Sequence, residues 1–444
     1  MKILPTIGPV TKNTRDLKLI FKYCSMVRVN TSHNKLSWHK NTINLIKKIN
    51  PNIDILVDIP GIKPRTNNQS DLILKKNQII KFGYNINSKN KDFVNLTRKL
   101  PKKNKRKSKF FSLDDGKIQF KLLNFKKNYI EGKALRDCII KPKKGLNIPN
   151  SVYDDNSQIK IYIDYLKKLK KNKFDAVGLS FIQNKKTIIN LKKKFPNILC
   201  VAKIENSEGL INVDDICKYA DAIMIDRGDL SAEIGDNNLY EAILKISETT
   251  KKNGKPLIMA TENLETMSNS NEPTKNDIIS LGFSRQINSD IIMLSEETAI
   301  SKKWKKIILW LNNFINSKIK IVNKKNDKNI FWKNVENIKD HTLVVFTKKG
   351  LMLNKIFNKN VKNDVFVFTD TKKTKILSNL YKNAKCFLTK KFNNKNINKF
   401  YYQNIKKYKK VIFKKSDNVF LVSISFPKKG SKANSLSLIN KNDI

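Results

Sequence analysis

Short apolar runs recur along roughly the first 320 residues, and each is followed by a polar corner and a helix-like pattern. Helical spacing is visible where Leu17, Ile20, Phe21 and Cys24 follow one another at i, i+3, i+4 and i+7. Near-continuous apolar strands that alternate with helices are typical of a buried parallel sheet. Eight runs are predicted to be such strands: Ile3–Gly8, Met26–Asn30, Ile53–Ile59, Ala176–Phe181, Ile198–Glu205, Ala222–Gly228, Pro256–Thr261 and Asp290–Glu297.

Eight strand–helix units predict a (β/α)₈ TIM barrel. The gap between the third and fourth strands is too long for a connection, and its alternating runs at Gln119–Leu123 and Tyr129–Ala134 predict a small inserted β domain. After about Val322 the chain becomes polar, and strand-like runs then resume in what we interpret as a separate α/β domain. These later runs are Leu343–Thr347, Asp364–Thr369 and Val419–Ser425.

The chain has 444 residues, which is too many for one hydrophobic core of ordinary size, and 40% of them are hydrophobic. We therefore predict an α/β protein of three domains. Residues 1–66 and 144–321 form the catalytic barrel, residues 67–143 form the inserted β domain as a lid, and residues 322–444 form the C-terminal α/β domain.

Two pairs of opposite charges lie at the carboxyl ends of the fifth and sixth predicted strands. Lys203 and Glu205 are two residues apart, as are Arg227 and Asp229. Strand side chains alternate between faces, so each pair is expected to point the same way. Buried ion pairs are costly to desolvate, which favours a chemical role, although a structural network of charges is the alternative.

Further polar side chains fall at the carboxyl ends of other predicted strands, where barrel enzymes place their catalytic groups. Any one of them could be an ordinary strand-end cap, but together they predict a site. Carboxylates among lysine and arginine suit an anionic substrate that is held through Mg²⁺ or Mn²⁺, and the cations suit a phosphoryl group. These side chains are Arg28, Asn30, Ser32, Asp58, Thr261 and Glu297.

The formal net charge of +51 raises the question of nucleic-acid binding. The excess is almost all lysine, spread along the chain with asparagine, isoleucine and phenylalanine, and only eight residues are arginine. Such a composition is typical of an AT-rich coding sequence, so we favour mutational bias and expect no specific nucleic-acid partner. A selected polyanion-binding role is the alternative. The densest patch, Lys102–Lys109, is predicted to be a solvated loop.

The cysteines and histidines exclude two classes of site. The five cysteines contain no CxxC pair, which indicates reduced thiols, and the three histidines are too few and too scattered for a zinc site. No apolar stretch approaches the ~20 residues of a membrane span, and the first ten residues lack the features of a signal peptide. We expect a cytoplasmic protein without a membrane partner.

A series of motifs in fixed order then resembles the pyruvate kinase family. They are TIGP, MVRVNTSH, VDIPGIKPRT, LDDGKI, KKGLNIP, AKIENSEG, IMIDRGDL, MATENLETM and IIMLSEETAI, with a weaker C-terminal match in LVVFTKKG and DNVFLVSISFPKKGSKANSLSLI. The resemblance covers the full length. It implies transfer of the phosphoryl group of phosphoenolpyruvate to ADP, giving pyruvate and ATP, with Mg²⁺ or Mn²⁺, in a homotetramer.

The resemblance also implies roles for individual residues. Glu205 and Asp229 would hold the divalent metal. Lys203 would neutralise the phosphoryl group in flight, and Thr261 would lie where the enolate is protonated. The substrate would further contact Arg28, Arg227, Gly228 and Asp229, with backbone N–H groups offered at a helix start. The nucleotide-binding residues would be Asn30, His33, Arg65 and Lys144.

Asn30, Ser32, Asp58 and the carbonyl of Ile59 match the family's monovalent-cation site. Potassium-dependent members have glutamate at the position of Lys63, and members that need no potassium have lysine there. We therefore expect that the Lys63 ammonium supplies this charge and that K⁺ is dispensable.

Several positions depart from the family pattern. Asp226 stands where alanine is usual, and its carboxylate could weaken Arg227 or raise the pKa of a neighbour. Glu262 and Asn263 replace the usual Gln-Met, and Ser280 and Phe283 interrupt a helix that usually helps to form the subunit contact. None of these changes removes a predicted site residue, so we expect an active enzyme.

Two other functions stay open at this point. One is another Mg²⁺-dependent barrel lyase that handles phosphoenolpyruvate or pyruvate, which would lack the inserted domain, the Thr261 motif and the C-terminal domain. The other is a basic polyanion-binding protein with a decayed site, which would be expected to have lost Lys203, Glu205, Asp229 or Thr261. All four residues are present.

Overall fold

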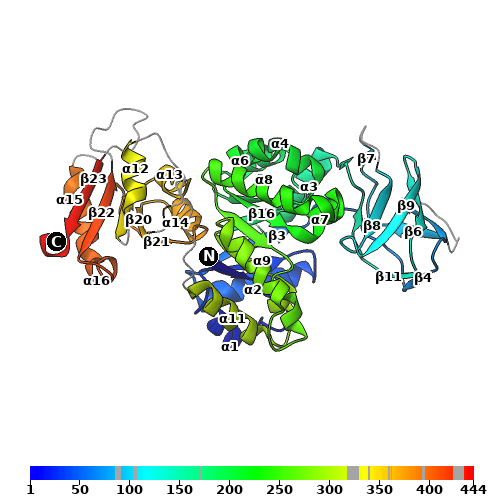
Figure 1. Cartoon of the computed structure of the whole chain (residues 1–444), viewed down its shortest axis with the longest axis horizontal. Coiled ribbons are helices and arrows are strands. Elements are labelled where there is room, and N and C mark those ends of the chain that lie inside the picture. The colour runs from blue at the N-terminus through cyan, green and yellow to red at the C-terminus, as the bar shows by residue number, and fades with distance from the viewer. Residues whose placement is uncertain are drawn as a thin grey trace.

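The chain folds into three bodies arranged in a row, with the barrel in the middle, a β-rich body at one end and an α/β body at the other (Figure 1). The computed structural model describes residues 1–85, 92–103, 108–169, 172–317, 330–338, 341–358, 361, 363–392, 396–423 and 435–444. Among the helices of these ranges, none combines the length and the apolar character that crossing a lipid bilayer requires.

Eight parallel strands form the central sheet, in the order β1-β18-β17-β16-β15-β14-β3-β2. The two outer strands meet through a bridge between Thr6 and Arg28, where the N–H of Ile7 donates to the Arg28 carbonyl at 2.8 Å. The predicted barrel is therefore confirmed. Its strands are β1 (Lys2–Pro5), β2 (Met26–Asn30), β3 (Asp54–Ile59), β14 (Ala176–Leu179), β15 (Leu199–Ile204), β16 (Ala222–Asp226), β17 (Leu257–Ala260) and β18 (Ile291–Leu294).

Most of the predicted barrel strands extend past the carboxyl ends of the observed strands. The sixth ends at Asp226, and Arg227 already begins helix α7 (Arg227–Ile234). The prediction that Arg227 and Asp229 point the same way from a strand is wrong, because residues two apart on a helix are separated by about 200°. Glu297 likewise lies in helix α10 (Glu296–Ala299) rather than in the eighth strand.

Helices cover the outside of the barrel and bury one apolar face each. In α2 (Leu36–Ile49), for example, Ile43 and Ile46 are fully buried against the strands. The other barrel helices are α1 (Thr14–Ile20), α3 (Asp155–Lys168), α4 (Lys185–Lys194), α5 (Ser207–Ile211), α6 (Val213–Tyr219), α8 (Leu239–Lys252), α9 (Lys275–Gln286) and α11 (Trp304–Asn316), with 3₁₀ turns at Asp236–Asn238 and Glu265–Ser268.

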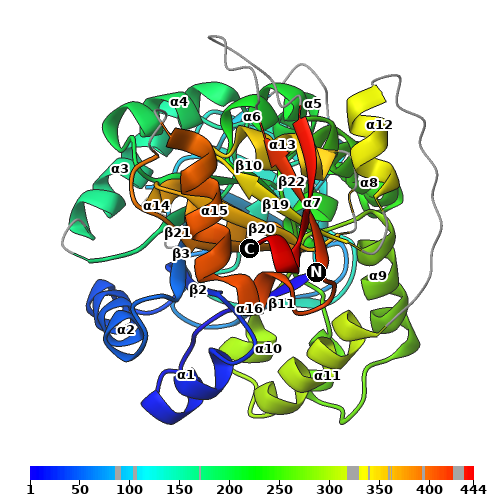
Figure 2. The same ribbon diagram turned by 90° about the vertical axis from the view of Figure 1, so that its left-hand side faces the viewer.

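The amino-terminal end of the barrel is closed by the C-terminal body, which lies directly in front of it in Figure 2. Ile376 of α14 (Lys372–Asn379) and the following Leu380 belong to the same buried cluster as the barrel-interior residues Leu4 and Met224. The Lys2 ammonium donates to the Asn379 carbonyl at 2.8 Å. The opposite end, where the strands finish, is therefore the end at which a site is open to ligands.

The inserted body contains a six-stranded sheet in the order β12-β8-β9-β10-β5-β6, with a core in which the Phe82, Phe111 and Phe120 rings stack or meet edge to face. Strand β12 of this sheet lies beyond residue 143, where the predicted inserted domain ends. The predicted division between residues 143 and 144 stays a prediction. The strands are β4 (Leu72–Leu74), β5 (Ile79–Tyr84), β6 (Phe93–Leu96), β7 (Lys102–Lys103), β8 (Phe110–Leu113), β9 (Ile118–Phe125), β10 (Tyr129–Ala134), β11 (Cys138–Ile140), β12 (Leu146–Asn147) and β13 (Ser151–Val152). Residues 104–107 of the basic patch lie outside the described residues.

The C-terminal body is a five-stranded sheet in the order β21-β20-β19-β22-β23. Its strands are β19 (Thr342–Phe346), β20 (Val365–Thr369), β21 (Ala384–Leu388), β22 (Asn418–Ser423) and β23 (Ser435–Asn440). Its helices are α12 (Ile330–Asn337), α13 (Leu351–Asn358), α14, α15 (Ile397–Lys407) and α16 (Lys409–Ile412), with a 3₁₀ turn at Lys441–Asp443. The predicted boundary at residues 321 and 322, and residues 424 and 425 of the last predicted strand, lie outside the described residues.

Candidate functional site

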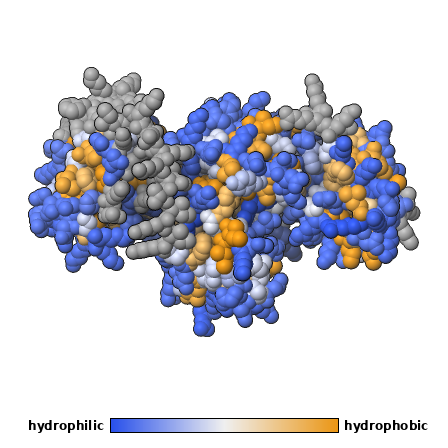
Figure 3. Space-filling view, viewed as in Figure 1, coloured by the Kyte–Doolittle hydropathy of each residue, from blue (hydrophilic) through white to orange (hydrophobic). Residues whose placement is uncertain are grey.

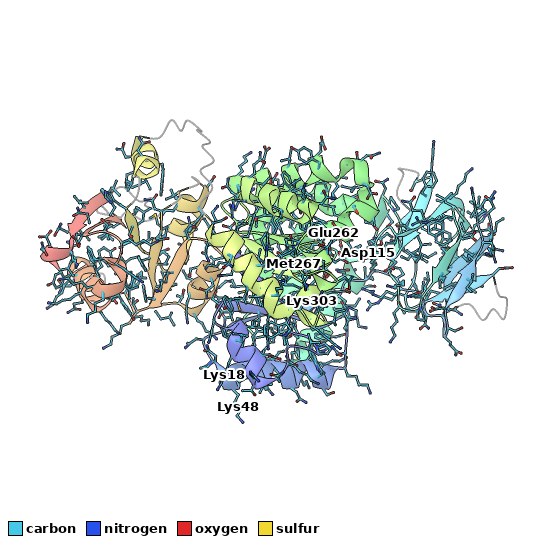
Figure 4. The ribbon with its side chains drawn as sticks, turned by 60° about the horizontal axis from the view of Figure 1, so that its bottom comes forward. Lys18, Lys48, Asp115, Glu262, Met267 and Lys303 are labelled. Atoms are coloured by element: carbon cyan, nitrogen blue, oxygen red, sulfur yellow. The ribbon has the colours of Figure 1, made fainter. Side chains whose placement is uncertain are left out.

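The predicted site residues gather at the carboxyl ends of the barrel strands, on the side of the inserted sheet. Figure 4 shows two neighbours of this region, with Glu262 on the barrel and Asp115 between the barrel and the inserted sheet. The strand that carries the central residue, β15, is buried along its whole length. Packing on both faces of β15 restricts the positions of the side chains at its end.

Lys203 is the central cation of this region and is 5% exposed. Its Nζ lies 2.7 Å from Glu205 Oε1, 3.3 Å from Asp226 Oδ2 and 3.4 Å from Asp58 Oδ2. Burial acts to lower the pKa of Lys203, but the three carboxylates outweigh it and hold that pKa well above its ordinary value. The ammonium therefore keeps its charge throughout the range in which enzymes work.

Glu205 follows Lys203 by two residues and is fully buried. Its Oε2 accepts a 2.6 Å hydrogen bond from the backbone N–H of Phe181, while Oε1 receives no hydrogen bond and contacts Lys203 only as an ion pair. Burial raises the pKa of Glu205, opposed by Lys203 and helped by Asp226 and Asp229. The Glu205 carboxylate is thus held by one backbone N–H and by the Lys203 ammonium.

Glu205, Asp226 and Asp229 form an acidic cluster in which one ligand oxygen of each lies within 4.8 Å of the others. Burial raises the pKa of Asp229 as well, with Lys63 opposing and the neighbouring carboxylates adding to the shift. Hard carboxylate oxygens at this spacing are the donor set that Mg²⁺ and Mn²⁺ take in proteins. The residues present thus fit the divalent metal that the resemblance implies.

Arg28 lies on β2 beside this cluster and is oriented by two partners. Its Nε and Nη2 contact Asp58 Oδ2 at 2.8 and 2.7 Å, and its Nη1 donates to Thr6 Oγ1 at 2.9 Å. Both ionic side chains are almost fully buried. Because Asp58 also lies near Lys203, the strand ends place two cations around one carboxylate, next to the acidic cluster.

Thr261 adopts a left-handed backbone conformation with φ of 58°, which is uncommon for a β-branched residue. Its hydroxyl accepts from the N–H of Arg227 at 3.0 Å and that of Gly228 at 3.3 Å, and it donates to Asp226 Oδ1 at 3.1 Å or to the Ala260 carbonyl at 2.7 Å. The N–H of Gly228, predicted to face the substrate, is thus directed at Thr261.

Arg227 does not reach the acidic cluster. Its guanidinium donates to the Thr261 carbonyl, to Ser280 Oγ and to Asn263 Oδ1, the last at 3.0 Å. The departures from the family pattern at Asn263 and Ser280 thus both contact Arg227. Its position supports the turn that carries Thr261 rather than any contact with Asp229.

Lys63 comes from the loop after β3 and reaches the acidic cluster from the side of the inserted sheet. Its ammonium is ion-paired with Asp229 and lies 3.1 Å from Asp115 Oδ1. Burial acts to lower the pKa of Lys63, but the two carboxylates raise it above its ordinary value. Among the described residues, the hydrogen bonds of this ammonium go to Asp115 and Asp229 and not to the predicted monovalent-cation residues.

The predicted monovalent-cation residues are only partly brought together. β2 and β3 pair Asn30 with Asp58, but the Asp58 carboxylate is occupied by Arg28 and Lys203. The Asp58 carbonyl accepts from Thr31, and the Ile59 carbonyl accepts from the N–H of Ser180 at 3.4 Å. Ser32 is exposed, and its backbone N–H donates a hydrogen bond to Asn30 Oδ1 at 3.0 Å.

Two of the predicted nucleotide-binding residues lie side by side where the inserted segment leaves and rejoins the barrel. Arg65 pairs with Gly145 in an antiparallel bridge, and the Thr66 N–H donates to the Lys144 carbonyl at 2.8 Å. The Lys144 ammonium is 2.8 Å from Asp114 Oδ1. Partial burial of the His33 ring and then the positive charge of Arg65 lower the pKa of His33 below its ordinary value.

Several neighbours of Lys203 and Arg28 were missed by sequence reasoning. Ser180 Oγ accepts from Lys203 at 3.2 Å, and Thr6 and Asp115 contact Arg28 and Lys63. All three directly follow a barrel strand or belong to a motif that the sequence displays. Strand-end position was the available signal for Thr6 and Ser180, and the LDDGKI motif was the available signal for Asp115, but neither signal was used for these three residues.

Comparison with known proteins identifies the relatives of this chain. Residues 1–305 match the family model described as pyruvate kinase, barrel domain. Over 318 residues the chain is 31% identical to the pyruvate kinase of Buchnera aphidicola subsp. Schizaphis graminum, and over 313 residues it is 29% identical to that of Thermococcus litoralis. Each alignment covers 68% of this chain and 66% of the relative, slightly less than two thirds of the relative's length.

Solved structures extend the likeness to the fold of nearly the whole chain. The structure of a pyruvate kinase from Cryptosporidium parvum superimposes with a TM-score of 0.80 at 22% identity, covering 99% of this chain and 95% of that one. The pyruvate kinase from Pyrobaculum aerophilum gives a TM-score of 0.78 at 18% identity and covers 99% and 98%. At these identities the superpositions show a common fold.

Proposed function

The chain belongs to the pyruvate kinase family, and from that premise we propose that it transfers the phosphoryl group of phosphoenolpyruvate to ADP, giving pyruvate and ATP. The observation that carries this proposal is the permanently charged Lys203 ammonium within hydrogen-bonding or ion-pairing distance of Glu205, Asp226 and Asp58. A fixed cation at the open end of the barrel can stabilise a phosphoryl group that carries negative charge in transit.

Lys203 and Arg28 would bind the phosphoryl group together. The two cations share Asp58, which holds both head groups in place before substrate arrives. Positioned charge of this kind needs no reorganisation during the reaction, which is the main source of electrostatic catalysis. Both cations belong to the central barrel, so the phosphoryl group would stay over the strand ends while it is transferred.

Glu205 and Asp229 would hold Mg²⁺ or Mn²⁺, because their oxygens belong to one cluster within 4.8 Å. When bound, the cation would act as a Lewis acid that stabilises negative charge on the substrate's carboxylate and phosphoryl oxygens. The protein's own part is to fix the two carboxylates. Phe181 does so for Glu205 through its backbone N–H, in a left-handed conformation with φ of 59°.

Thr261 would direct protonation of the enolate that remains after phosphoryl transfer. Its hydroxyl is held by the N–H groups of Arg227 and Gly228, which leaves its proton for Asp226 or the Ala260 carbonyl. To hold a water at the enolate face, this hydroxyl would turn its proton from those acceptors to the water. Arg65, Lys144, His33 and Asn30, which flank the inserted segment or lie near it, would contact the phosphates of ADP.

A coupled assay tests the proposal by following pyruvate and ATP formation from phosphoenolpyruvate and ADP with Mg²⁺. Lys203→Met should lower kcat by about 10³-fold or more, since it removes the central positive charge. Lys185→Met is the matched control, because Lys185 pairs with Asp215 on the surface. It should retain the activity of the unmodified protein.

A lack of pyruvate and ATP formation by the unmodified, folded protein would refute the proposal. Formation of ATP separates the proposal from the two alternatives, since neither a barrel lyase nor a polyanion-binding protein makes ATP from these substrates. Equal activity in Lys203→Met and Lys185→Met would show that Lys203 is not the residue on which transfer depends.

We further propose that K⁺ is dispensable, as the lysine at position 63 suggests. The Lys63 ammonium is buried between Asp229 and Asp115, so it adds a fixed positive charge close to the acidic cluster. Replacing K⁺ by tetramethylammonium should leave the rate within about tenfold, which corresponds to roughly 1.4 kcal/mol of barrier. A larger drop would contradict potassium independence.

We also propose a cytoplasmic homotetramer. The five cysteines are free thiols, as expected in a reducing compartment. Helix α9, at the family's usual subunit contact, exposes Ile278 and Ile279 at 39% and 68%. Figure 3 shows that apolar areas are present on the surface of the barrel. Sedimentation velocity would test the assembly, and a monomer at micromolar concentration would refute it.

A further inference from the structure

Asp226 is a buried carboxylate that does not cap the helix it precedes. It ends strand β16 and precedes helix α7 at the N-cap position, where an aspartate commonly accepts a hydrogen bond from the helix. Its side chain makes no such cap bond. With 7% exposure it is also withdrawn from water, so its desolvation is not offset by helix capping.

The two Asp226 oxygens face the reaction centre instead. Oδ1 accepts from the Thr261 hydroxyl at 3.1 Å, and Oδ2 lies 3.3 Å from Lys203 Nζ. An ionised carboxylate offers about four acceptor positions, so each oxygen keeps capacity for a further partner. Glu205 Oε1, which belongs to a fully buried side chain, lies 2.7 Å from the same ammonium.

The charges around this centre do not balance. Five carboxylates belong to the connected set, namely Asp58, Asp115, Glu205, Asp226 and Asp229, whereas the cations bound to them through the described residues are Arg28, Lys63 and Lys203. The deficit is two positive charges. Without Asp226 the deficit would be one, so this aspartate brings the set to the charge of one divalent cation.

We propose that Asp226 is a third protein ligand of the divalent-metal site, beside Glu205 and Asp229, and that it strengthens metal binding in the absence of substrate. The inference rests on the proposed function, which supplies the reason for a metal at Glu205 and Asp229. Its own support is the position of Asp226 within 4.8 Å of both ligands and its free acceptor capacity. Affinity for a hard divalent cation rises with the number of charged ligands.

The third carboxylate would also make metal binding less dependent on the substrate. With two carboxylates, a cation keeps more positions for water and for substrate oxygens, so its binding depends on the substrate. With three, more of the negative charge that holds the cation comes from the protein. The expected result is a metal that stays bound between turnovers.

The test measures Mn²⁺ binding to the substrate-free full chain by electron paramagnetic resonance, which reports free Mn²⁺. Asp226→Asn and Asp226→Ala should each weaken binding by at least tenfold, and Glu205→Gln should weaken it further. The asparagine variant keeps the size of the side chain, and thermal melting of each variant shows that it is folded.

Glu233→Gln is the matched control for removal of a buried carboxylate near the site. Glu233 lies one helical turn after Asp229, is 1% exposed and bonds Asn147 Nδ2 at 3.3 Å, outside the acidic cluster. Its variant should bind Mn²⁺ within about twofold of the unmodified protein. A tenfold loss in this control would mean that the Asp226 effect is not specific and would overturn the inference.

The inference is also overturned if both folded Asp226 variants bind Mn²⁺ within twofold of the unmodified protein while Glu205→Gln loses binding. That outcome leaves the proposed function intact, because it still places a metal at Glu205. The proposed function fails separately, by absence of pyruvate and ATP formation in the coupled assay on the same protein preparation.

Discussion

Thr261 keeps a backbone conformation that its β-branched side chain disfavours, at a cost of order 1–3 kcal/mol. Four hydrogen bonds to its hydroxyl and carbonyl oxygens, from Arg227 and Gly228, compensate for the strain. Strained backbone that the surroundings hold in place is frequent at catalytic sites. The function of this arrangement is to fix one hydroxyl over the open end of the barrel.

Replacement of Thr261 should separate the role of its hydroxyl from that of its shape. Thr261→Ala should lower kcat by about 10²-fold or more, in the range of lost proton-transfer groups. Thr261→Ser keeps the hydroxyl and should stay within about tenfold of the unmodified enzyme. Steady-state kinetics at saturating substrate measures both. Equal losses in the two variants would show that the methyl group or the turn, not the hydroxyl, matters.

Asp54 is a second residue whose environment predicts a measurable effect. It begins β3, is 4% exposed and accepts a 2.5 Å hydrogen bond from Asn379 Nδ2. Burial raises the pKa of Asp54 from 3.8 to about 6, against the Asn379 hydrogen bond and with some help from Asp175. A carboxyl whose pKa is raised on folding destabilises the protein once it must be charged.

The sign follows from proton binding. Below pH 4 both states hold the proton, and between about pH 4 and 6 only the folded state does, so stability falls as pH rises through that window. Above pH 6 the penalty is complete, on the order of 3 kcal/mol. Asp54→Asn, whose amide oxygen can still accept from Asn379, should therefore melt close to the unmodified protein at pH 4 and several degrees above it at pH 7.5. Differential scanning calorimetry at both pH values checks this, and a melting difference independent of pH would contradict it.

The barrel strands were predictable because they are apolar on both faces. Met26–Asn30 and Ala222–Asp226 consist almost entirely of buried residues, and such runs stand out in a polar, lysine-rich chain. The short strands β21 and β23 were missed, because β21 contains a lysine and exposes Leu388 and β23 alternates serine with leucine. Pairing with a neighbouring strand, which no local pattern reveals, decides their conformation.

The site was predictable to the extent that its residues follow strands. Lys203 and Glu205 lie together, as the period of two on β15 indicated. Arg227 and Asp229 do not, because the predicted strand ran to Gly228 whereas the helix already begins at Arg227. The contacts of Lys63 with Asp115 and Asp229 join a loop, the inserted sheet and a helix. Such long-range contacts depend on tertiary packing and cannot be inferred from spacing.

Helix α14 is the element that links the C-terminal body to the barrel. It places Ile376 and Leu380 in the barrel-interior cluster, and the Tyr381 hydroxyl donates to the Gly254 carbonyl at 2.7 Å. Lys2, whose pKa burial lowers to about 8, donates to carbonyls at the end of the helix. The barrel core is thus completed by residues from outside the barrel.

Truncation of Leu380 should therefore destabilise the barrel as well as the C-terminal body. Leu380→Ala removes a fully buried side chain and should cost about 2–5 kcal/mol. Leu351→Ala is the matched control, since Leu351 is 65% exposed in the same body, and it should change stability by less than about 0.5 kcal/mol. Denaturant unfolding followed by tryptophan fluorescence compares the two. Similar midpoints would mean that the barrel does not depend on this contact.

The net charge of +51 is a property of the complete chain rather than of one face. Ion pairs such as Lys218 with Asp214 and Lys415 with Asp364 neutralise only a few of the lysines, and these pairs are exposed. Exposed charge of one sign favours solubility and attracts polyanions without selecting a sequence. Mutational bias rather than a selected nucleic-acid site stays a prediction.

Binding to duplex DNA should accordingly be weak and controlled by salt. We expect affinity for a random duplex to fall by about 10³-fold or more between 50 and 200 mM salt, and the dissociation constant at physiological salt to be weaker than about 1 μM. Filter binding across a salt series measures both values. Submicromolar binding at 150 mM salt, or a clear preference for one sequence, would favour a selected polyanion site instead.

The closure of the barrel by Ile376 and Leu380 has a consequence for how the protein is made. A ribosome releases the last barrel strand, Ile291–Leu294, several seconds before Leu380 at the usual ~5–20 residues per second. During that interval the nascent barrel exposes the apolar side chains at its amino-terminal end, including Leu4 and Met26. The chain would therefore be a substrate for chaperones late in its synthesis, and a transcript truncated after the barrel would yield an aggregation-prone product.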